Sequence, residues 1–304
     1  MQRAWRRATY DRIASGALRL WFRVSSKLSL AAIQRLGRTV GEVVYLFGGS
    51  PKRITRSNLE VCFPDMSESE RRQLTRASLR QTGCYATELG IAWCPGDARW
   101  KELIVDVQGF EAIDDARSQR RAILFLVPHY GSWELLSLYL GGRFPLTVLY
   151  ERPRYPLVES IALQGRTRTG CRLMANDLSG LRALYGGLRD GEAVGLLPDQ
   201  VPPVRSGEYA PFFGRDALTM TLAHRLIEKF EPCVVLCYAE RLSNGRGFRL
   251  GFERLPDVES ARDSQESLAA MNKAIERVAV RDPSQYQWEY RRFRRPRDAS
   301  ERIY

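Results

Sequence analysis

The chain has 304 residues, 44% of them hydrophobic, so it can bury one large core or two smaller ones. It carries 47 Lys and Arg against 35 Asp and Glu, a formal net charge of +12. This excess predicts a polyanionic partner: nucleic acid, an anionic membrane surface, a phosphorylated substrate or an acidic carrier protein.

Cysteine and histidine usage argues against several classes of site. The chain has only two histidines, too few for a three-histidine metal site, and no metal site is expected. The six cysteines form no CxxC pair and no cluster with histidine, which argues against zinc fingers and redox dithiols. We expect them to be reduced, small buried hydrophobes in a compartment facing the cytosol: Cys62, Cys84, Cys94, Cys171, Cys233 and Cys237.

The N-terminal region, residues 1–50, is predicted to be helical. Its first seven residues are basic, but no apolar core of a signal peptide follows. Charged residues interrupt the apolar residues up to 47, so the uncharged run of roughly 18 residues that a spanning helix needs is missing. The pattern favours two amphipathic helices, near 12–24 and 28–47. They either lie on a membrane surface or form a cap on the protein's own core.

Residues 51–304 are expected to form one domain, with a helical part to about residue 100 followed by an α/β core. The Gly48–Pro51 segment ends the N-terminal region. Ser67 and Glu70 have capping-box spacing and predict a helix that ends near Trp93, before Pro95 and Gly96.

After residue 100, apolar runs typical of buried strands alternate with helical patterns. Strands separated by helices indicate a mixed, largely parallel sheet with helices on its faces. The predicted strands are 122–127, 146–150, 193–197, 233–239 and 248–252, and the predicted helices are 133–141, 156–167, 178–189, 218–230 and 264–280.

One of the two histidines follows the first of these strands. His129 is followed by Gly131, at which the chain can turn, and by Glu134, in the first turn of the next helix, which Ser132 is placed to cap. A carboxylate beside an imidazole selects its tautomer and stabilises the imidazolium, so that the ring can take a proton from an alcohol. A buried histidine and an ordinary first-turn acid would give the same spacing.

Asp199 is predicted to lie near His129. It follows strand 193–197, and in open α/β sheets ligands bind beyond the carboxyl ends of the strands. The other histidine, His224, is interpreted as a structural residue in the middle of a helix. The segment 165–170 has the glycine spacing of a phosphate loop but lacks the Lys-Ser/Thr that follows it, and no GxSxG or HExxH motif is present.

The ordered motifs resemble one family. His129 and Glu134 match the HX4D/E motif of glycerolipid acyltransferases, and nearly the whole chain is similar to the late acyltransferases of lipid A biosynthesis, the lauroyl and myristoyl transferases. The segments that carry the resemblance are Asn58–Leu59, Cys62–Pro64, His129–Glu134, Tyr150–Pro153, Gly165–Arg168, Pro198–Gln200, Pro211–Gly214 and Gln287–Phe293, followed by Arg295–Pro296.

This resemblance implies a glycerolipid-acyltransferase-like fold and a membrane-associated O-acyltransferase. His129 would be the general base and Glu134 its orienting partner, with Arg166 and Asp199 as further catalytic residues. Arg166 could hold a phosphate or the developing oxyanion. The resemblance also implies that substrate contacts come from Arg152, Arg168, Gln200, Phe212 and Phe213, with Phe212 and Phe213 near the entry of the acyl chain.

The same resemblance implies the substrates and the location. The donor would be an acyl thioester, on acyl carrier protein or coenzyme A, with no other cofactor. The acceptor would be an anionic lipid A precursor, and the site of action the cytoplasmic face of the inner membrane. The basic surface would then serve the carrier protein and the lipid phosphates rather than nucleic acid.

The chain departs from the family at three places, and alternatives follow. Many members have asparagine at the position of Ser132 and a polar or basic residue at that of Pro128, and their N-terminal anchor is more apolar. The same chemistry on another glycolipid, an aminolipid or a lysophospholipid is therefore an alternative. A basic protein that coats anionic lipid without turnover is a more remote one.

Overall fold

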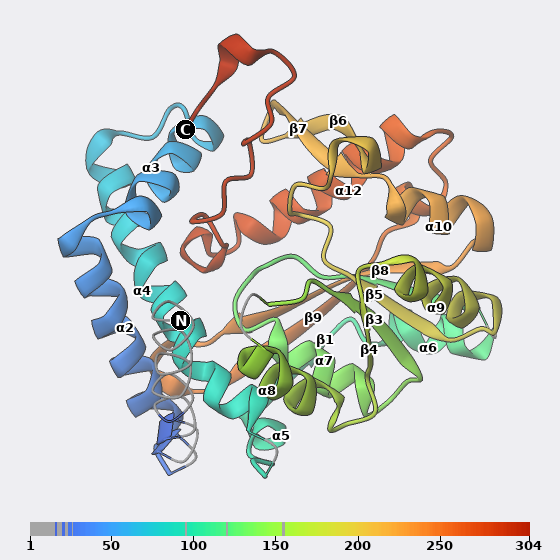
Figure 1. Cartoon of the computed structure of the whole chain (residues 1–304), viewed down its shortest axis with the longest axis horizontal. Coiled ribbons are helices and arrows are strands. Elements are labelled where there is room, and N and C mark those ends of the chain that lie inside the picture. The colour runs from blue at the N-terminus through green and yellow to red at the C-terminus, as the bar shows by residue number, and fades with distance from the viewer. Residues whose placement is uncertain are drawn as a thin grey trace, which may run out of the picture.

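A computed structural model describes residues 16, 20–21, 24–25, 27–94, 96–119, 121–153 and 156–304. The first amphipathic helix expected from the sequence, near 12–24, lies mostly outside the described residues. The expected mixed α/β fold with a helical N-terminal region is confirmed (Figure 1).

The centre of the molecule is a seven-stranded sheet in the order β1-β9-β8-β2-β5-β3-β4. Neighbouring strands are parallel except β8 and β9, which pair antiparallel. A separate antiparallel hairpin is formed by β6 and β7. The strands are β1 (Ile104–Gln108), β2 (Ile123–Leu126), β3 (Leu146–Tyr150), β4 (Arg172–Ala175), β5 (Ala193–Leu196), β6 (Gly207–Phe212), β7 (Arg215–Met220), β8 (Cys233–Arg241) and β9 (Phe248–Arg254).

Helices cover both faces of the sheet, because its central strands are apolar on both sides. In β2, Leu124 and Leu126 face one core, together with α9, α10 and α12. Ile123 and Phe125 face the other, with α4 (Glu68–Trp93), α6 and α7. These helices and the short ones are α5 (Trp100–Leu103), α6 (Glu111–Ser118), α7 (Glu134–Gly141), α8 (Pro156–Thr167), α9 (Leu178–Arg189), α10 (Leu222–Phe230), α11 (Pro256–Glu259) and α12 (Ser264–Ala279).

Three helices, α2 (Leu30–Phe47), α3 (Ser50–Cys62) and α4 (Glu68–Trp93), form a layer at one side of the sheet (Figure 1). The capping box predicted at Ser67 and Glu70 is confirmed at the start of α4. Helices α2 and α4 approach closely through glycines: a Cβ on Gly83 would lie 2.0 Å from the Gly37 carbonyl oxygen. No helix in the described part of the chain has the length and apolarity needed to cross a membrane.

All five predicted strands exist, but the sequence patterns missed β1, β4 and the β6–β7 hairpin. β1 and β4 are short edge strands that are only partly buried, so they lack a continuous apolar run. The predicted helix 218–230 was wrong at its start, because residues 218–220 belong to β7 and α10 begins at Leu222.

The loop after β2 is held by two neighbouring segments. Gly131 has a φ of +60° and forms a bridge with Ala239 of β8. Its N–H donates to the Gln285 carbonyl over 3.0 Å, and a Cβ at this position would lie 1.9 Å from the Ala239 carbonyl oxygen. Only glycine fits this combination of backbone conformation and close approach.

Replacing Gly131 with alanine should therefore destabilise the protein by about 1–3 kcal/mol, since the added methyl group collides with backbone in a packed region. Thermal denaturation measures the effect. Gly186→Ala in α9 is the matched control, because nothing lies within 4 Å of a Cβ there. Equal melting temperatures for the Gly131→Ala variant and the wild type would contradict this description of the loop.

Candidate active site

The register of the sheet brings His129 and Asp199 together. β2 and β5 are parallel neighbours, and their last residues, Leu126 and Leu196, are partners. Each of the two polar residues follows three positions after its strand, so both lie at the same carboxyl edge. The prediction that they share this edge is confirmed.

Asp199 holds His129 through both of its carboxylate oxygens. Oδ1 lies 2.7 Å from the ring Nδ1, and Oδ2 accepts from the backbone N–H of His129 over 2.8 Å. The Asp199 side chain is 2% exposed. Burial alone would raise its pKa, but the charge of His129 and these hydrogen bonds outweigh burial and lower it. Asp199 is thus kept ionised.

This contact determines which nitrogen of the ring is free. An ionised carboxylate can only accept, so Nδ1 of His129 carries the hydrogen and Nε2 of the neutral ring carries a lone pair. Nε2 lies 3.2 Å from Nε2 of Gln200. The ring edge packs against Trp133, with centroids 4.9 Å apart, and Trp133 stacks on Tyr85 of α4. The imidazole is therefore fixed in orientation, with its basic nitrogen toward Gln200.

Glu134, expected to orient His129, has other partners. It accepts from Nε of Arg166 over 2.7 Å and is also bonded to Nη2 of that residue. The indole N–H of Trp93 donates to it over 3.0 Å. The carboxylate that contacts the His129 ring is Asp199. Position in the first turn of α7 is confirmed for Glu134, but Ser132 does not cap that helix, because Trp133 occupies the N-cap.

The Glu134–Arg166 pair ties three helices together. The Glu134 side chain on α7 is 2% exposed, and it meets Arg166 from α8 and Trp93 at the end of α4. Burial opposes ionisation of Glu134, but the Arg166 charge and hydrogen bonds are stronger and lower its pKa. Arg166 keeps a side chain that is 24% exposed, and its expected role toward a phosphate or an oxyanion stays a prediction.

Two of the predicted substrate-binding arginines lie outside the His129 cluster. Arg168 donates to three carbonyl oxygens at the C-terminal end of α4: that of Ile91 in the last turn, and those of Cys94 and Asp97 just after it. These contacts make Arg168 a helix-capping residue. The Arg152 side chain is 67% exposed, and its Nη2 lies 3.9 Å from Oδ2 of Asp177.

The remaining predicted residues surround a pocket beside His129. Gln200 and Phe212 line this pocket. Phe213 is not part of the lining but makes edge-to-face contacts with Phe212 and Phe63. The backbone N–H of Phe213, which has a positive φ of 50°, donates to Glu276 over 2.6 Å. The other lining residues are Asn58, Asp199, Tyr286, Gln287, Trp288, Tyr290, Arg292 and Phe293.

Most of this lining comes from the segment 285–293, for which the sequence predicted no site role. The segment forms a bridge at Tyr286 with Tyr130, and the N–H of Gln287 donates to the His129 carbonyl over 3.0 Å. Asn58 donates from Nδ2 to the carbonyl oxygens of Trp288 and Tyr290 over 2.6 and 2.7 Å. The signal in the sequence was the density of aromatic residues in a segment without regular structure.

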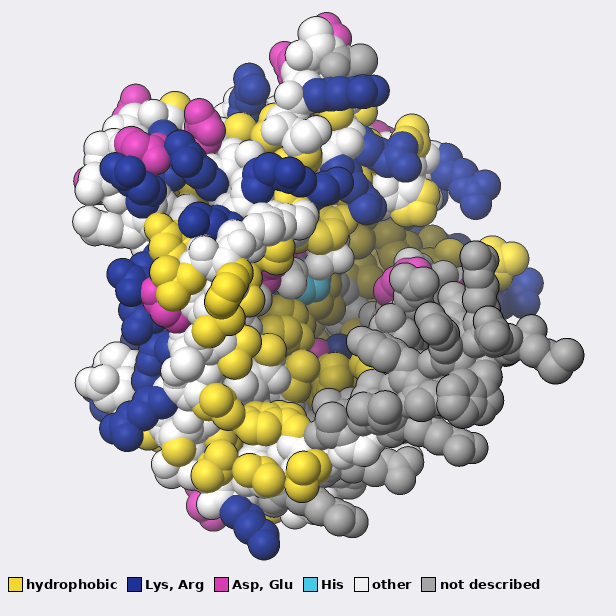
Figure 2. Space-filling model, turned by 60° about the vertical axis from the view of Figure 1, so that its left-hand side comes forward, with side chains coloured by type: hydrophobic (Ala, Val, Ile, Leu, Met, Phe, Trp, Pro, Cys, Tyr) yellow, Lys and Arg dark blue, Asp and Glu magenta, His cyan; other side chains and the backbone are white. Residues whose placement is uncertain are grey.

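The surface at this site is hollowed. Figure 2 shows hydrophobic side chains around a hollow with a histidine at its floor and Lys and Arg side chains along its upper rim. His129 is 13% exposed. Among the described residues, no group of three or more His, Cys, Asp or Glu side chains could hold a metal ion. His224 is half-buried in α10.

The arrangement could serve as a general base: an oriented imidazole beside a pocket that polar and aromatic residues line. Comparison with known proteins gives the family. The family described as bacterial lipid A biosynthesis acyltransferase matches residues 8–295, so the chain belongs to that family and is an acyltransferase.

Curated relatives agree along most of the chain. The chain is 32% identical to a lipid A biosynthesis lauroyltransferase of Escherichia coli strain K12 over 90% of its own length and 89% of the relative's. It is 30% identical to a palmitoleoyltransferase of the same pathway and organism, over 92% and 89% of the two chains. A myristoyltransferase of that organism is 27% identical, over 84% and 78%. The resemblance seen in the sequence motifs is confirmed.

Replacing Glu134 with glutamine should destabilise the protein at neutral pH by about 3–5 kcal/mol, because Arg166 loses its countercharge. The folded-state pKa of Glu134 is lowered, so its contribution is present above the unfolded pKa of about 4.3 and is lost as the pH falls through the folded value. Urea denaturation at a series of pH values should show the difference from wild type shrinking below about pH 4.

Glu266→Gln is the control for this experiment, since Glu266 pairs with Arg262 on the exposed surface. We expect it to leave the urea midpoint unchanged. A Glu134→Gln variant as stable as wild type at neutral pH would contradict the structural role of the ion pair.

Proposed function

We propose that this protein transfers a fatty acyl chain from an acyl thioester to a hydroxyl group of a lipid A precursor, with His129 as the general base. The observation that supports this most directly is the Asp199–His129 pair, with Nε2 of the ring facing a pocket. Membership of the lipid A acyltransferase family supports the class of acceptor. No cofactor beyond the acyl thioester is proposed.

In the proposed reaction, Nε2 of His129 takes the proton of the acceptor hydroxyl as its oxygen attacks the thioester carbonyl carbon. The new C–O bond forms while the carbonyl electron pair moves to oxygen. When the tetrahedral intermediate collapses, the C–S bond breaks and the imidazolium returns the proton to the leaving thiolate. Asp199 stabilises the imidazolium throughout, as a buried carboxylate on Nδ1 does in hydrolase triads.

The aromatic wall of the pocket supports an apolar donor chain. Phe212, Tyr286 and Trp288 line the pocket, and Trp288 makes an edge-to-face contact with Phe63. Aromatic side chains bind an alkyl chain through area and dispersion rather than through directed bonds. We place the acyl chain there, with its thioester toward His129.

The positive rim supports anionic substrates. Figure 2 shows Lys and Arg side chains along the upper rim of the hollow. Exposed arginines lie within and directly after the pocket-lining segment: Arg291, Arg294, Arg295 and Arg297. Such a cluster attracts phosphorylated lipid and acidic protein surfaces alike. We propose that it binds the phosphates of the acceptor and docks acyl carrier protein as the donor.

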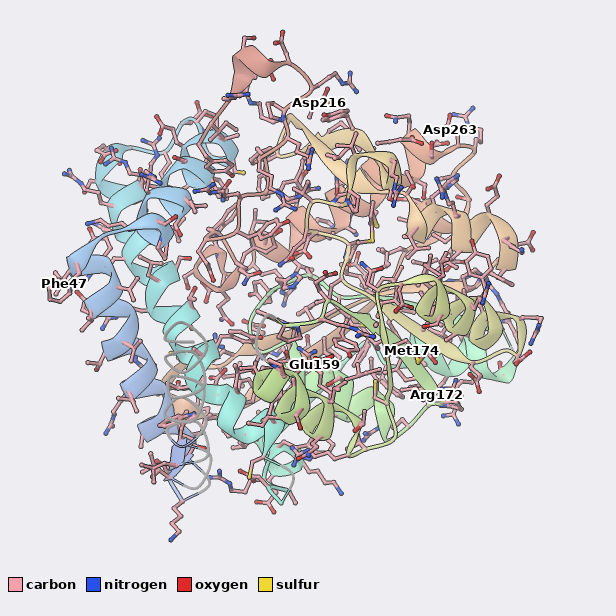
Figure 3. All side chains as sticks on the ribbon, in the orientation of Figure 1. Phe47, Glu159, Arg172, Met174, Asp216 and Asp263 are labelled. Atoms are coloured by element: carbon pink, nitrogen blue, oxygen red, sulfur yellow. The ribbon has the colours of Figure 1, made fainter. Side chains whose placement is uncertain are left out.

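Helix α2 supports the proposed location at the cytoplasmic face of the inner membrane. Its outer face is an exposed apolar stripe at helical spacing: Leu36, Val40, Val43, Leu46 and Phe47. Phe47 is 87% exposed and points away from the molecule (Figure 3). An apolar helical face of this kind, near the exposed Arg35 and Arg53, suits the interface of an anionic bilayer.

Replacing His129 with alanine should reduce acyl transfer by a factor on the order of 10⁴ or more, since the variant lacks both the base and the acid of the reaction. The measurement is transfer from acyl carrier protein or coenzyme A thioesters to a phosphorylated disaccharide lipid acceptor. His224→Ala is the matched control and should retain activity. Near-wild-type transfer by His129→Ala would overturn the mechanism.

Introducing aspartate at Val40 and Val43 together should weaken binding to anionic phospholipid vesicles at least tenfold, because two charges enter the apolar face and repel the surface. Vesicle co-sedimentation measures this. Val280→Asp places one such charge on an exposed valine at the end of α12 and should leave binding unaltered. Equal binding by all three proteins would show that α2 does not face the membrane.

A further inference from the structure

Gln200 occupies the place beside the catalytic nitrogen where a reacting oxygen has to arrive. Its Nε2 lies 3.2 Å from Nε2 of His129 and 3.2 Å from Oε1 of Gln287. Both neighbours are acceptors, because His129 already donates from Nδ1 to Asp199. Only the NH₂ end of the Gln200 amide can serve both, so its carbonyl oxygen faces away from the imidazole.

The direction of that amide is set by a chain of side chains behind it. Gln287 accepts from Gln200 with Oε1, so its own NH₂ group is turned elsewhere. The buried carboxyl group of Glu289 neighbours the Gln287 side chain, and a hydrogen bond with Gln287 acts to lower its pKa. A hydrogen bond that lowers the pKa of a carboxyl group is one that the carboxyl group accepts, so Glu289 favours the NH₂ end of Gln287.

The buried carboxyl group of Glu289 is only partly hydrogen-bonded. Its Oε2 is buried with no hydrogen-bond partner among the residues that the structure describes. Burial raises the pKa of this carboxyl group, against the weaker opposing effect of its hydrogen bonds and of His129. An incompletely paired acid next to an active site costs stability, which is consistent with a functional role.

We propose that Gln200 is a catalytic residue that donates from Nε2 to the oxyanion of the tetrahedral intermediate, and that Gln287 and Glu289 are positioning residues that fix the direction of its amide. The inference rests on the proposed acyl transfer. When the acceptor hydroxyl replaces Gln200 at Nε2 of His129, the amide remains beside the carbon that bears both the new C–O bond and the oxyanion. A donor already directed there needs no reorganisation.

The test is steady-state acyl transfer by Gln200→Met, a neutral variant of similar size that cannot donate. We expect kcat to fall by about 10²–10³, the usual loss for one oxyanion donor, with KM nearly unchanged. Gln200→Asn, which keeps the NH₂ group but withdraws it from the imidazole, should lose kcat as well. Gln200→Asn also replaces Gln200→Met as the test variant if the methionine variant does not fold. Gln119→Met, at an exposed position, is the control and should match wild type.

The positioning residues are tested in the same assay. Gln287→Met removes the acceptor that orients Gln200, and kcat should fall about fivefold to tenfold, the change that corresponds to one hydrogen bond. Glu289→Gln lets the Gln287 amide turn either way, and kcat should fall about twofold or more. In both, an unchanged KM and melting temperature separate positioning from a general structural role.

The outcomes distinguish the inference from the proposed function. Absence of transfer by the wild-type protein with every thioester donor would refute the proposed function itself. Active wild type with an equally active Gln200→Met variant would overturn the role of Gln200 alone. If kcat falls in Gln200→Met but stays at the wild-type value in Gln287→Met and Glu289→Gln, Gln200 is the oxyanion donor. The positioning roles of Gln287 and Glu289 are then refuted.

Discussion

The double hydrogen bond from His129 to Asp199 is the contact on which the site depends. It uses a backbone N–H and a ring nitrogen of one residue, so it fixes the loop after β2 and the tautomer of the imidazole together. The buried carboxylate could not stay ionised without these donors, and the ring would lack a defined basic nitrogen without the carboxylate. The contact is possible because β2 and β5 are parallel and in register, so that both strands end at the same edge of the sheet.

A second constraint comes from the C-terminal segment, which binds both the loop that carries His129 and the loop that carries Asp199. Gln287 donates from its backbone to the His129 carbonyl. The hydroxyl of Tyr290 accepts from the N–H of Val201, just after Asp199 and Gln200. The buried guanidinium of Arg292 donates to Leu218 and Thr219 of β7, which joins the hairpin to the same segment. The pocket is therefore held together by contacts between residues that are far apart in the sequence.

Much of the fold and part of the site could be predicted from the sequence. Strands such as Ala193–Leu196 are continuous apolar runs, and the edge of the sheet that carries His129 and Asp199 follows from where those runs end. The partner of His129 could not be chosen from spacing alone. Glu134 is near in sequence, but its backbone position in the first turn of α7 directs its carboxylate to Arg166. Nor could spacing predict that Arg168 binds three carbonyl oxygens at the end of α4.

The central claim, that a buried carboxylate keeps Nε2 of His129 basic, is tested most directly by kcat for acyl transfer in the Asp199→Asn variant. Asparagine keeps the size of the side chain but can donate to Nδ1 and so favours the wrong tautomer. We predict a loss on the order of 10³–10⁴ in kcat with the fold intact, as in triads whose carboxylate is neutralised. A variant that folds and transfers acyl chains at nearly the wild-type rate would contradict the account.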